Sequence, residues 1–346
     1  MPEDNRVSQP MSGISFGELE RRRTVDYFLF VFLSPKASGH GLPMSLPGRD
    51  NHALAATGSR SRMLTATIED VRARVDAARS QAGAVVGLVP TMGFFHEGHL
   101  SLMRAARAEC TFVVVSAFVN PIQFGATEDF NTYPRDLDKD LAAAAGEGVD
   151  LMFAPPEREM YQEGFDTMVT PGRISRDLCG ASRPGHFRGV ATVVAKLFNI
   201  IRPDLAYFGQ KDAQQAAIIR RMAVDLNFDV GIRVCPIIRE PGGLAMSSRN
   251  TYLSADEREQ ATVLYEALAQ AAESVAAGET SVSRIRRQVK KQVGARFLVE
   301  LEYIRIVDPE TLEPVETVER EALAAIAAKV GRTRLIDNIT LSPPGT

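Results

Sequence analysis

The chain has 346 residues, 45% of them hydrophobic and 24% charged, and its 40 basic and 43 acidic side chains give a formal net charge of −3. A chain of this length can bury a sizeable core and is long enough for two domains. The near-neutral charge excludes a general attraction to nucleic acid or to anionic membranes, so we expect neither as a partner. Three cysteines that lie far apart and form no C-x-x-C pair argue against a disulfide framework and a zinc clip, and favour a reducing cytoplasm.

Residues 1–62 differ from the remainder of the chain. Their one apolar run, YFLFVFL at 27–33, is much shorter than the roughly 20 residues that a membrane-spanning helix needs. The segment is also a poor match to a signal peptide, and the acidic residues between Glu3 and Asp26 argue against an organellar transit peptide. We expect a disordered or non-native extension before a natural start near Met63, with a targeting segment as the open alternative.

From residue 65 onward, helical and strand patterns alternate. Apolar residues at helical spacing and short apolar runs predict a helix at 68–78, a strand at 84–90, a helix at 99–109, a strand at 111–120, a helix at 136–147, a strand at 150–155, a helix at 190–201, a strand at 205–209, a helix at 213–226 and a strand at 230–238. The strands are apolar almost throughout, which is typical of a parallel sheet covered on both faces. This alternation predicts an α/β fold with a Rossmann-like, doubly wound parallel sheet.

The pattern changes after residue 238. A loop with Pro241, Gly242 and Gly243 leads into a long polar helical region at 254–292 and then to an alternating run at 298–308, which suits an antiparallel strand with one wet face. The segments that flank Gly331 predict a final pair of strands. We therefore expect a smaller C-terminal α+β domain. The predicted division is an extension at 1–62, a Rossmann-like ligand-binding domain at 63–237 and the α+β domain at 238–346.

The stretch PTMGFFHEGH, residues 90–99, follows the first long strand at the edge where doubly wound sheets bind ligands. Met92 and Gly93 allow a tight turn, and the helix behind them offers free N–H groups and a positive dipole end, which suit phosphate. His96 and His99 lie three apart and can point at the same anion. Two capping histidines without a ligand are the open alternative. Zinc is disfavoured because no further ligands stand at metal spacing.

Two common nucleotide-binding motifs, G-x-x-x-x-G-K-[ST] and G-x-G-x-x-G, are missing from the sequence. A strand-end H-x-G-H resembles instead the nucleotidyl-transferase superfamily, whose members attack the α-phosphate of a nucleotide and release pyrophosphate. Such chemistry depends on positioning and charge stabilisation, which imidazolium, lysine, magnesium and helix N-termini can supply.

Two further stretches can supply charge and hydroxyl groups. In FGQKD, residues 208–212, Lys211 could neutralise phosphates and Asp212 could hold magnesium or ribose, although a solvated charge pair would look the same. AMSSRN, residues 245–250, places two hydroxyls and an arginine where a helix is expected to begin, which suits phosphate or a plain N-cap turn.

A third stretch, FVNPIQF at 118–124, closes the second strand. Asn120 and Gln123 offer amides that could orient a hydroxy acid, with a turn-forming Asn-Pro as the alternative. Together, VPTMGFFHEGH, FVNPIQF, FGQKDAQQ and LAMSSRN resemble, in order and spacing, the pantothenate synthetase (pantoate–β-alanine ligase) family. The resemblance covers about residues 63–342, including TRLIDNI at 333–339. Family members begin close to the position that Met63 holds relative to P-T-M-G.

The resemblance implies a ligase that forms a C–N bond in pantothenate and coenzyme A biosynthesis. ATP and (R)-pantoate would give pantoyl adenylate and pyrophosphate, and β-alanine would then displace AMP to form pantothenate. It implies His99 as proton donor and charge stabiliser, with Lys211 as the second catalytic residue. Gln123 and Gln215 match pantoate-binding glutamines, and Gln123 would also bind β-alanine. The residues that match ATP-binding positions are Met92, Gly93, Phe94, Phe95, His96, Glu97, Gly98, His99, Gly209, Gln210, Lys211, Asp212, Ile238, Met246, Ser247, Ser248 and Arg249.

Further implications concern the surroundings of this site. Arg183 and His186 match positions near the active site, and residues 238–346 would act as a lid that hinges at Pro241–Gly243. The resemblance also implies Mg²⁺, with unknown ligands, small-molecule partners (pantoate, β-alanine and ATP) and a homodimer, and the cysteine usage favours a cytoplasmic location. Three positions differ from the residue that is frequent in the family: Gln210 replaces a glutamate, Ala213 replaces a tyrosine and Gly242 replaces an acidic residue. The remaining alternatives are another H-x-G-H nucleotidyl-transferase and an inactive homologue that binds nucleotide.

Overall fold

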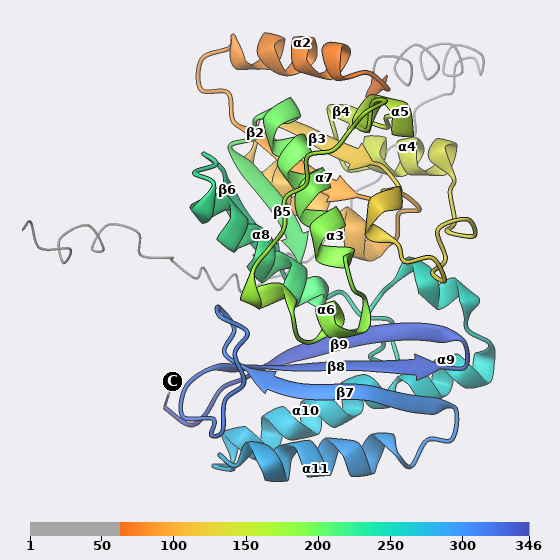
Figure 1. Cartoon of the computed structure of the whole chain (residues 1–346), viewed down its shortest axis with the longest axis vertical. Helices are drawn as coiled ribbons and strands as arrows, with labels where there is room; N and C mark the ends of the chain where they lie inside the picture. Colours follow the sequence, from red (N-terminus) through yellow and green to blue (C-terminus); the bar gives the residue numbers. More distant parts are fainter. Residues whose placement is uncertain (1–62, 346) are drawn as a thin grey trace, which may run out of the picture. The chain divides into compact units, whose positions relative to one another are not determined.

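A six-stranded parallel sheet forms the first part of the computed structural model, which describes residues 63–345; the extension predicted for residues 1–62 lies outside them. The strand order is β1-β4-β3-β2-β5-β6 (Figure 1). The strands are β1 (Leu64–Thr65), β2 (Val86–Thr91), β3 (Phe112–Ala117), β4 (Leu151–Phe153), β5 (Leu205–Gly209) and β6 (Gly231–Cys235). The chain adds β3 and β4 on one side of β2 and then β5 and β6 on the other. The direction of winding therefore reverses between β2 and β5.

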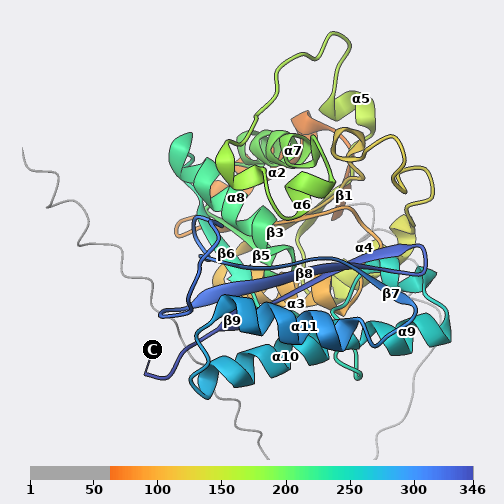
Figure 2. The ribbon, with the colours of Figure 1, turned by 60° about the horizontal axis from the view of Figure 1, so that its bottom comes forward.

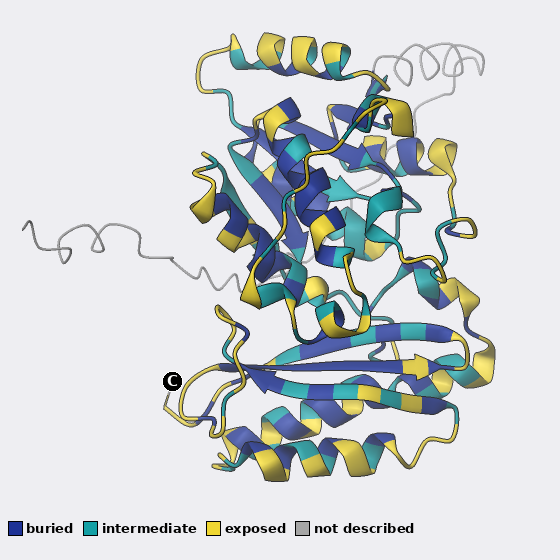
Figure 3. Cartoon of the chain, in the orientation of Figure 1, coloured by how far each residue is buried: buried dark blue, intermediate teal, exposed yellow. Residues whose placement is uncertain are grey.

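Successive residues of the parallel strands face two separate apolar layers. In β2, Leu88 packs into a core with helices α2, α7 and α8, whereas Val89 packs into a core with α3 and α4. Both side chains are fully buried, and Figure 3 shows exposure gathered on the outer sides of the helices. The helices of this part are α2 (Ile68–Arg79), α3 (Glu97–Glu109), α4 (Leu137–Gly146), α5 (Glu157–Met160), α6 (Cys179–Ser182), α7 (His186–Ile201) and α8 (Ala213–Asp225). A sheet covered on both faces explains why its strands are apolar throughout.

The last third of the chain forms a three-stranded antiparallel sheet with helices on one face (Figure 2). Its elements are α9 (Ala255–Ala261), α10 (Val263–Ala276), α11 (Val282–Val293), β7 (Val299–Val307), β8 (Ala322–Val330) and β9 (Thr333–Leu341). The central strand β8 is buried on both faces, because Leu323 and Ala325 pack against Leu178 and against Ala217 of α8. The predicted α/β fold, a Rossmann-like doubly wound sheet with a smaller C-terminal α+β part, is confirmed.

Several element boundaries differ from the sequence predictions for local reasons. The long helical region predicted at 254–292 is three helices, interrupted at Thr262 and again at 277–281, where Gly278 has a φ of 102°. The helix predicted at 190–201 begins at His186, directly after the left-handed Gly185. The two-residue strand β1 was not predicted, because two residues carry no periodic signal. The strand pair on either side of Gly331 is confirmed.

Candidate active site

A pocket opens at the carboxyl ends of β2 and β5, where the winding of the sheet reverses. Open α/β sheets bind their ligands at such a switch point. Three of the motifs singled out in the sequence meet there, because one follows β2, one follows β5 and one follows the last parallel strand, β6. An adjoining pocket, which shares several of these residues, extends toward α7 and contains Gln123 and Gln215.

His96 and His99 cap the first turn of α3 reciprocally. The Nδ1 atom of His96 accepts a hydrogen bond from the N–H of Gly98 at 3.1 Å, and the Nδ1 atom of His99 accepts one from the N–H of His96 at 3.3 Å. The two ring centroids lie 4.1 Å apart. A Cβ on Gly98 would approach the His96 ring to 2.9 Å, so this arrangement requires glycine between the two histidines. The histidines therefore cap the helix and also line the pocket.

Both imidazoles are neutral near pH 7, which differs from the imidazolium expected from sequence. Burial, and then the charge of Lys211, lowers the pKa of His96 to about 4. Burial, with His96 and Lys211 as further causes, lowers the pKa of His99 well below its ordinary value. Because both Nδ1 atoms accept backbone hydrogen bonds, the remaining proton of each ring lies on Nε2. The pair can thus donate two neutral hydrogen bonds to a ligand.

A buried carboxylate holds the turn that precedes His96. The two oxygens of Asp140, in α4, accept hydrogen bonds from the N–H groups of Phe94 and Phe95, each at 2.6 Å. Phe94 has a φ of 55°, a conformation that needs such support in a residue with a side chain. Asp140 is 3% exposed. Sequence reasoning missed this residue, because an aspartate near the start of a helix reads as a partner of the helix dipole.

Lys211 lies on η3 (Gln210–Asp212), a short 3₁₀ turn between β5 and α8. Its ammonium group forms no hydrogen bond or ion pair with residues 63–345, and burial lowers its pKa while Asp212 opposes this effect. Lys211 lines the first pocket, and Asp212 lines both pockets. An ammonium group with no partner in the described protein, beside two neutral donors, is suited to an anion.

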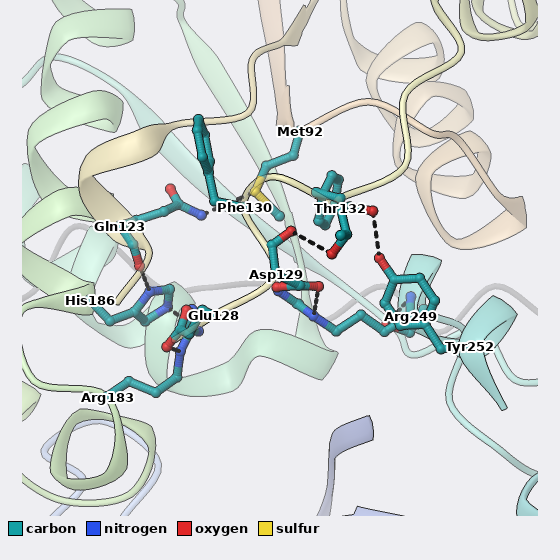
Figure 4. Close-up of polar contacts among 12 residues, drawn as sticks. Met92, Gln123, Glu128, Asp129, Phe130, Thr132, Arg183, His186, Arg249 and Tyr252 are labelled. Atoms are coloured by element: carbon teal, nitrogen blue, oxygen red, sulfur yellow. Dashed lines mark hydrogen bonds and ion pairs between the residues drawn. The ribbon is translucent and has the colours of Figure 1, made fainter. Parts of the chain in front are cut away.

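Arg249 reaches the same pocket from η4 (Ser248–Tyr252) and pairs with a carboxylate from the loop after η1 (Pro121–Gln123). Its guanidinium donates two hydrogen bonds to Asp129, at 2.9 and 2.7 Å (Figure 4). The neighbouring Glu128 accepts two from Arg183, at 2.8 and 2.5 Å. This loop therefore holds an arginine on each side of the site, which the sequence did not indicate.

Gln123 and His186 are linked at the adjoining pocket. The Nδ1–H of His186 donates to the main-chain oxygen of Gln123 at 2.9 Å, while its Nε2 lies 2.9 Å from Nη1 of Arg183. The side chain of Gln123 contacts the Sδ atom of Met92 at 3.1 Å (Figure 4). Asn120 is 1% exposed, and Tyr161, Gln123 and Gly189 satisfy its amide, so it supports Gln123 rather than lining the pocket.

Comparisons with known proteins show the family of the chain. The sequence model of the pantoate-beta-alanine ligase family matches residues 63–340. The pantothenate synthetase of Heliobacterium modesticaldum is 55% identical over 276 residues, which are 79% of this chain and 98% of that protein.

The chain belongs to the pantoate-β-alanine ligase family.

Solved structures of this family superpose on the chain. The pantothenate synthetase of Thermus thermophilus matches with a TM-score of 0.77 at 45% identity, over 81% of this chain and all of the other. A pantoate-β-alanine ligase of Francisella tularensis, complexed with β,γ-ATP and β-alanine, matches with a TM-score of 0.65 at 34% identity, over 80% of this chain and 97% of the other. Matches of this extent confirm the resemblance found in the sequence.

The structure brings most of the predicted ATP-binding residues of this ligase family together. Those that line the pocket are Met92, His96, Gly98, His99, Gly209, Lys211, Asp212, Ile238, Met246, Ser247, Ser248 and Arg249. The other predicted residues do not line this pocket; they are Gly93, Phe94, Phe95, Glu97 and Gln210. Glu97 forms an ion pair with Arg104, and Gln210 contacts β9. Gln215 lines both pockets, and its amide forms no hydrogen bond with residues 63–345. Ligand binding by each of these residues stays a prediction.

Two further findings concern metals and membranes. Within residues 63–345, no group of three or more His, Cys, Asp and Glu side chains is arranged to hold a metal ion. In the same part of the chain, every helix is too short or too polar to cross a membrane.

Proposed function

We propose that the chain condenses (R)-pantoate with β-alanine at the expense of ATP, giving pantothenate, AMP and pyrophosphate through a pantoyl adenylate. One observation carries the proposal. The neutral donors of His96 and His99, the ammonium group of Lys211 and the N-terminus of α3 converge on one pocket at the switch point of the sheet. This combination suits a triphosphate whose inner phosphorus is attacked. The β,γ-ATP and β-alanine in the Francisella tularensis relative support the assignment.

In the first step, a carboxylate oxygen of pantoate bonds to the α-phosphorus of ATP. The bond from that phosphorus to the bridging oxygen breaks, and its electron pair leaves with pyrophosphate. Lys211 would neutralise negative charge that develops on the phosphate oxygens, and the Nε2–H of His99 would donate a hydrogen bond to them. Gln123 and Gln215, in the adjoining pocket, would orient pantoate.

In the second step, the free amine of β-alanine bonds to the acyl carbon of the adenylate. The carbon–oxygen bond to AMP breaks, AMP leaves with its electron pair, and the new amide nitrogen releases one proton. Gln123 would contact β-alanine as well as pantoate, as the family resemblance implies; its amide contacts Met92, and both residues line the adjoining pocket. The N–H donors of the pocket would hold AMP as it leaves.

Mg²⁺ fits this site as a companion of the nucleotide. The described residues contain no preformed set of three or more metal ligands. One carboxylate, that of Asp212, lies at the pocket wall beside Lys211. Magnesium commonly binds through one or two carboxylates and the phosphates of its substrate. Bound there, it would supply positive charge to the phosphates, and Asp212 would be its protein ligand. A homodimer, which rests on the family resemblance, and a cytoplasmic location, which rests on the scattered cysteines, complete the proposal.

Pyrophosphate exchange tests the proposed function. The enzyme should incorporate labelled pyrophosphate into ATP when pantoate is present, and it should show no exchange without pantoate. Equal exchange with and without pantoate would indicate another nucleotidyl-transferase. A protein that binds ATP without any exchange would be an inactive homologue, and ADP in place of AMP as the product would defeat the adenylate scheme.

A further inference from the structure

Asn338 ties the C-terminal sheet to the turn that carries Lys211. The residue lies on β9, within the TRLIDNI stretch, and is 3% exposed. Its Nδ2 donates to the main-chain oxygens of Gln210 and Lys211, at 2.9 and 3.0 Å, and its Oδ1 accepts from Nε2 of Gln210 at 3.0 Å. All three hydrogen bonds of the side chain therefore go to two consecutive residues of η3.

Within residues 63–345, no side chain other than that of Asn338 forms a hydrogen bond with the backbone of this turn. Its N-cap, Gly209, has no side chain, and Asp212, which precedes α8, makes no capping hydrogen bond. Lys211 has no partner at its ammonium end among residues 63–345, so the position of that group depends on the backbone that bears it. The side-chain amide of Asn338 holds the backbone of η3 by its bonds to the main-chain oxygens of Gln210 and Lys211.

Asn338 is itself held in place from the other side. Its N–H donates to Oδ1 of the adjacent Asp337 at 2.7 Å, and Asp337 forms two hydrogen bonds with Arg239, at 2.6 and 3.0 Å. The guanidinium of Arg239 also lies 4.0 Å from the centroid of the Tyr265 ring. A partly buried ion pair and an aromatic ring thus fix the middle of β9, where Asn338 contacts η3, so Asn338 is held from the side opposite η3 as well.

We propose that Asn338 is a positioning residue for Lys211, so that the C-terminal sheet sets the geometry of the phosphate site. The inference rests on the role of Lys211 in the proposed function. Loss of the three hydrogen bonds lets η3 shift. A displacement of about 1 Å at a charge-stabilising group can lower a rate about 100-fold, while the binding of substrates elsewhere in the site is little affected.

The test compares Asn338→Ser and Gln210→Ala with the wild-type enzyme and with Thr340→Ala. Asn338→Ser removes the amide donor and acceptor that reach η3 and leaves a shorter hydroxyl without adding charge. Gln210→Ala truncates a partly exposed side chain and removes one of the three hydrogen bonds. Thr340 is exposed on the same strand and serves as the control. Each variant is assayed for pantoate-dependent pyrophosphate exchange, for its thermal unfolding midpoint, and for acetylation of single lysines by peptide mass spectrometry.

For Asn338→Ser we expect an exchange kcat about 10- to 100-fold below wild type, with a KM for pantoate within about twofold. The acetylation rate of Lys211 should change, while that of the exposed Lys329 stays constant. Gln210→Ala should lower kcat by a smaller factor at an unchanged unfolding midpoint, which keeps the test valid if Asn338→Ser unfolds. Thr340→Ala should match wild type in every assay.

The inference fails if Asn338→Ser, or Gln210→Ala where the serine variant does not fold, keeps both full exchange and the wild-type reactivity of Lys211. It also fails if kcat falls only in proportion to the folded fraction, because Asn338 would then be structural alone. Lys211→Ala separates this failure from failure of the proposed function. If Lys211→Ala is fully active, the role given to Lys211 is wrong; if it is inactive while Asn338→Ser is active, only the positioning role is wrong.

Discussion

The Nδ1 atom of His99 accepts a hydrogen bond from the N–H of His96, whose own Nδ1 accepts one from the N–H of Gly98, so each imidazole uses its Nδ1 on the backbone and keeps its Nε2–H for the pocket. Gly98 makes this possible, since any Cβ at that position would lie 2.9 Å from two atoms of the His96 ring. The spacing of the motif is therefore set by helix capping, and it also places both rings at the proposed ligand site.

Gly98→Ala should displace the His96 ring and break its cap. We expect an exchange kcat lower by about tenfold or more, because a donor to the phosphates moves out of position. The control is Gly146→Ala at the exposed end of α4, where a new Cβ would meet no atom within 4 Å. Steady-state exchange assays on both variants measure the effect. Equal rates for Gly98→Ala and Gly146→Ala would show that the His96 ring has no part in turnover.

Asp140→Asn should loosen the turn before His96. The asparagine amide has one oxygen to accept from the two backbone N–H groups, and its NH₂, which is also a donor, would face the second N–H. A buried N–H left without an acceptor costs about 1–3 kcal/mol, so urea unfolding should show a loss of that size. Exchange should fall as well. Asp138→Asn, on the exposed side of the same helix, is the matched control and should change neither quantity. A fully stable Asp140→Asn enzyme would contradict the role assigned to the carboxylate.

The unfolding free energy should decrease as the pH falls from about 6.5 to about 4. Burial, and then the charge of Arg183, lowers the pKa of His186 to about 4. Between these pH values the unfolded chain binds a proton that the folded chain does not, so acid favours unfolding. His96 contributes in the same direction. His186→Asn should make the slope shallower by up to about 1.4 kcal/mol per pH unit, which is the share of one proton. Urea unfolding at several pH values measures both slopes, and an unchanged slope in the variant would contradict the buried, neutral state of His186.

Gln123→Ala should mainly raise the KM for pantoate, because we assign its amide to binding in both the ground and the transition state. Gly189→Ala offers a second way to disturb the same residue. A Cβ on Gly189 would lie 2.4 Å from the main-chain oxygen of Ile122 and 2.6 Å from Cα of Gln123. This variant should show the same KM defect together with a loss of stability of about 1–3 kcal/mol from overpacking. Wild-type pantoate kinetics in both variants would place the acid pocket elsewhere.

The sequence predicted the fold well where signals are local. Continuous apolar runs located the parallel strands, and the strand at 205–209 coincides with β5. The two-residue β1 and the breaks at Thr262 and 277–281 were missed, because neither leaves a periodic pattern. The motifs located Lys211 and the two histidines, since each follows a strand.

The supporting residues of the site could not be found in this way. Each lies far along the chain from the group that it holds: Asp140 is 45 residues from Phe95, Asp129 is 120 from Arg249, and Asn338 is 127 from Lys211. Only the tertiary fold brings the partners together. The neutral state of the histidines also depends on burial, which the sequence does not show. Local chemistry can be predicted from motifs, whereas its positioning depends on long-range contacts.

Transfer of oxygen from pantoate to AMP tests the central claim most directly. Pantoate labelled with ¹⁸O in its carboxylate is incubated with the enzyme, ATP and β-alanine, and the products are analysed by mass spectrometry. If the carboxylate attacks the α-phosphorus in the pocket between β2 and β5, one ¹⁸O atom will appear in the phosphoryl group of AMP and none in pyrophosphate. AMP without the label would contradict the account, because pantothenate would then form without a pantoyl adenylate.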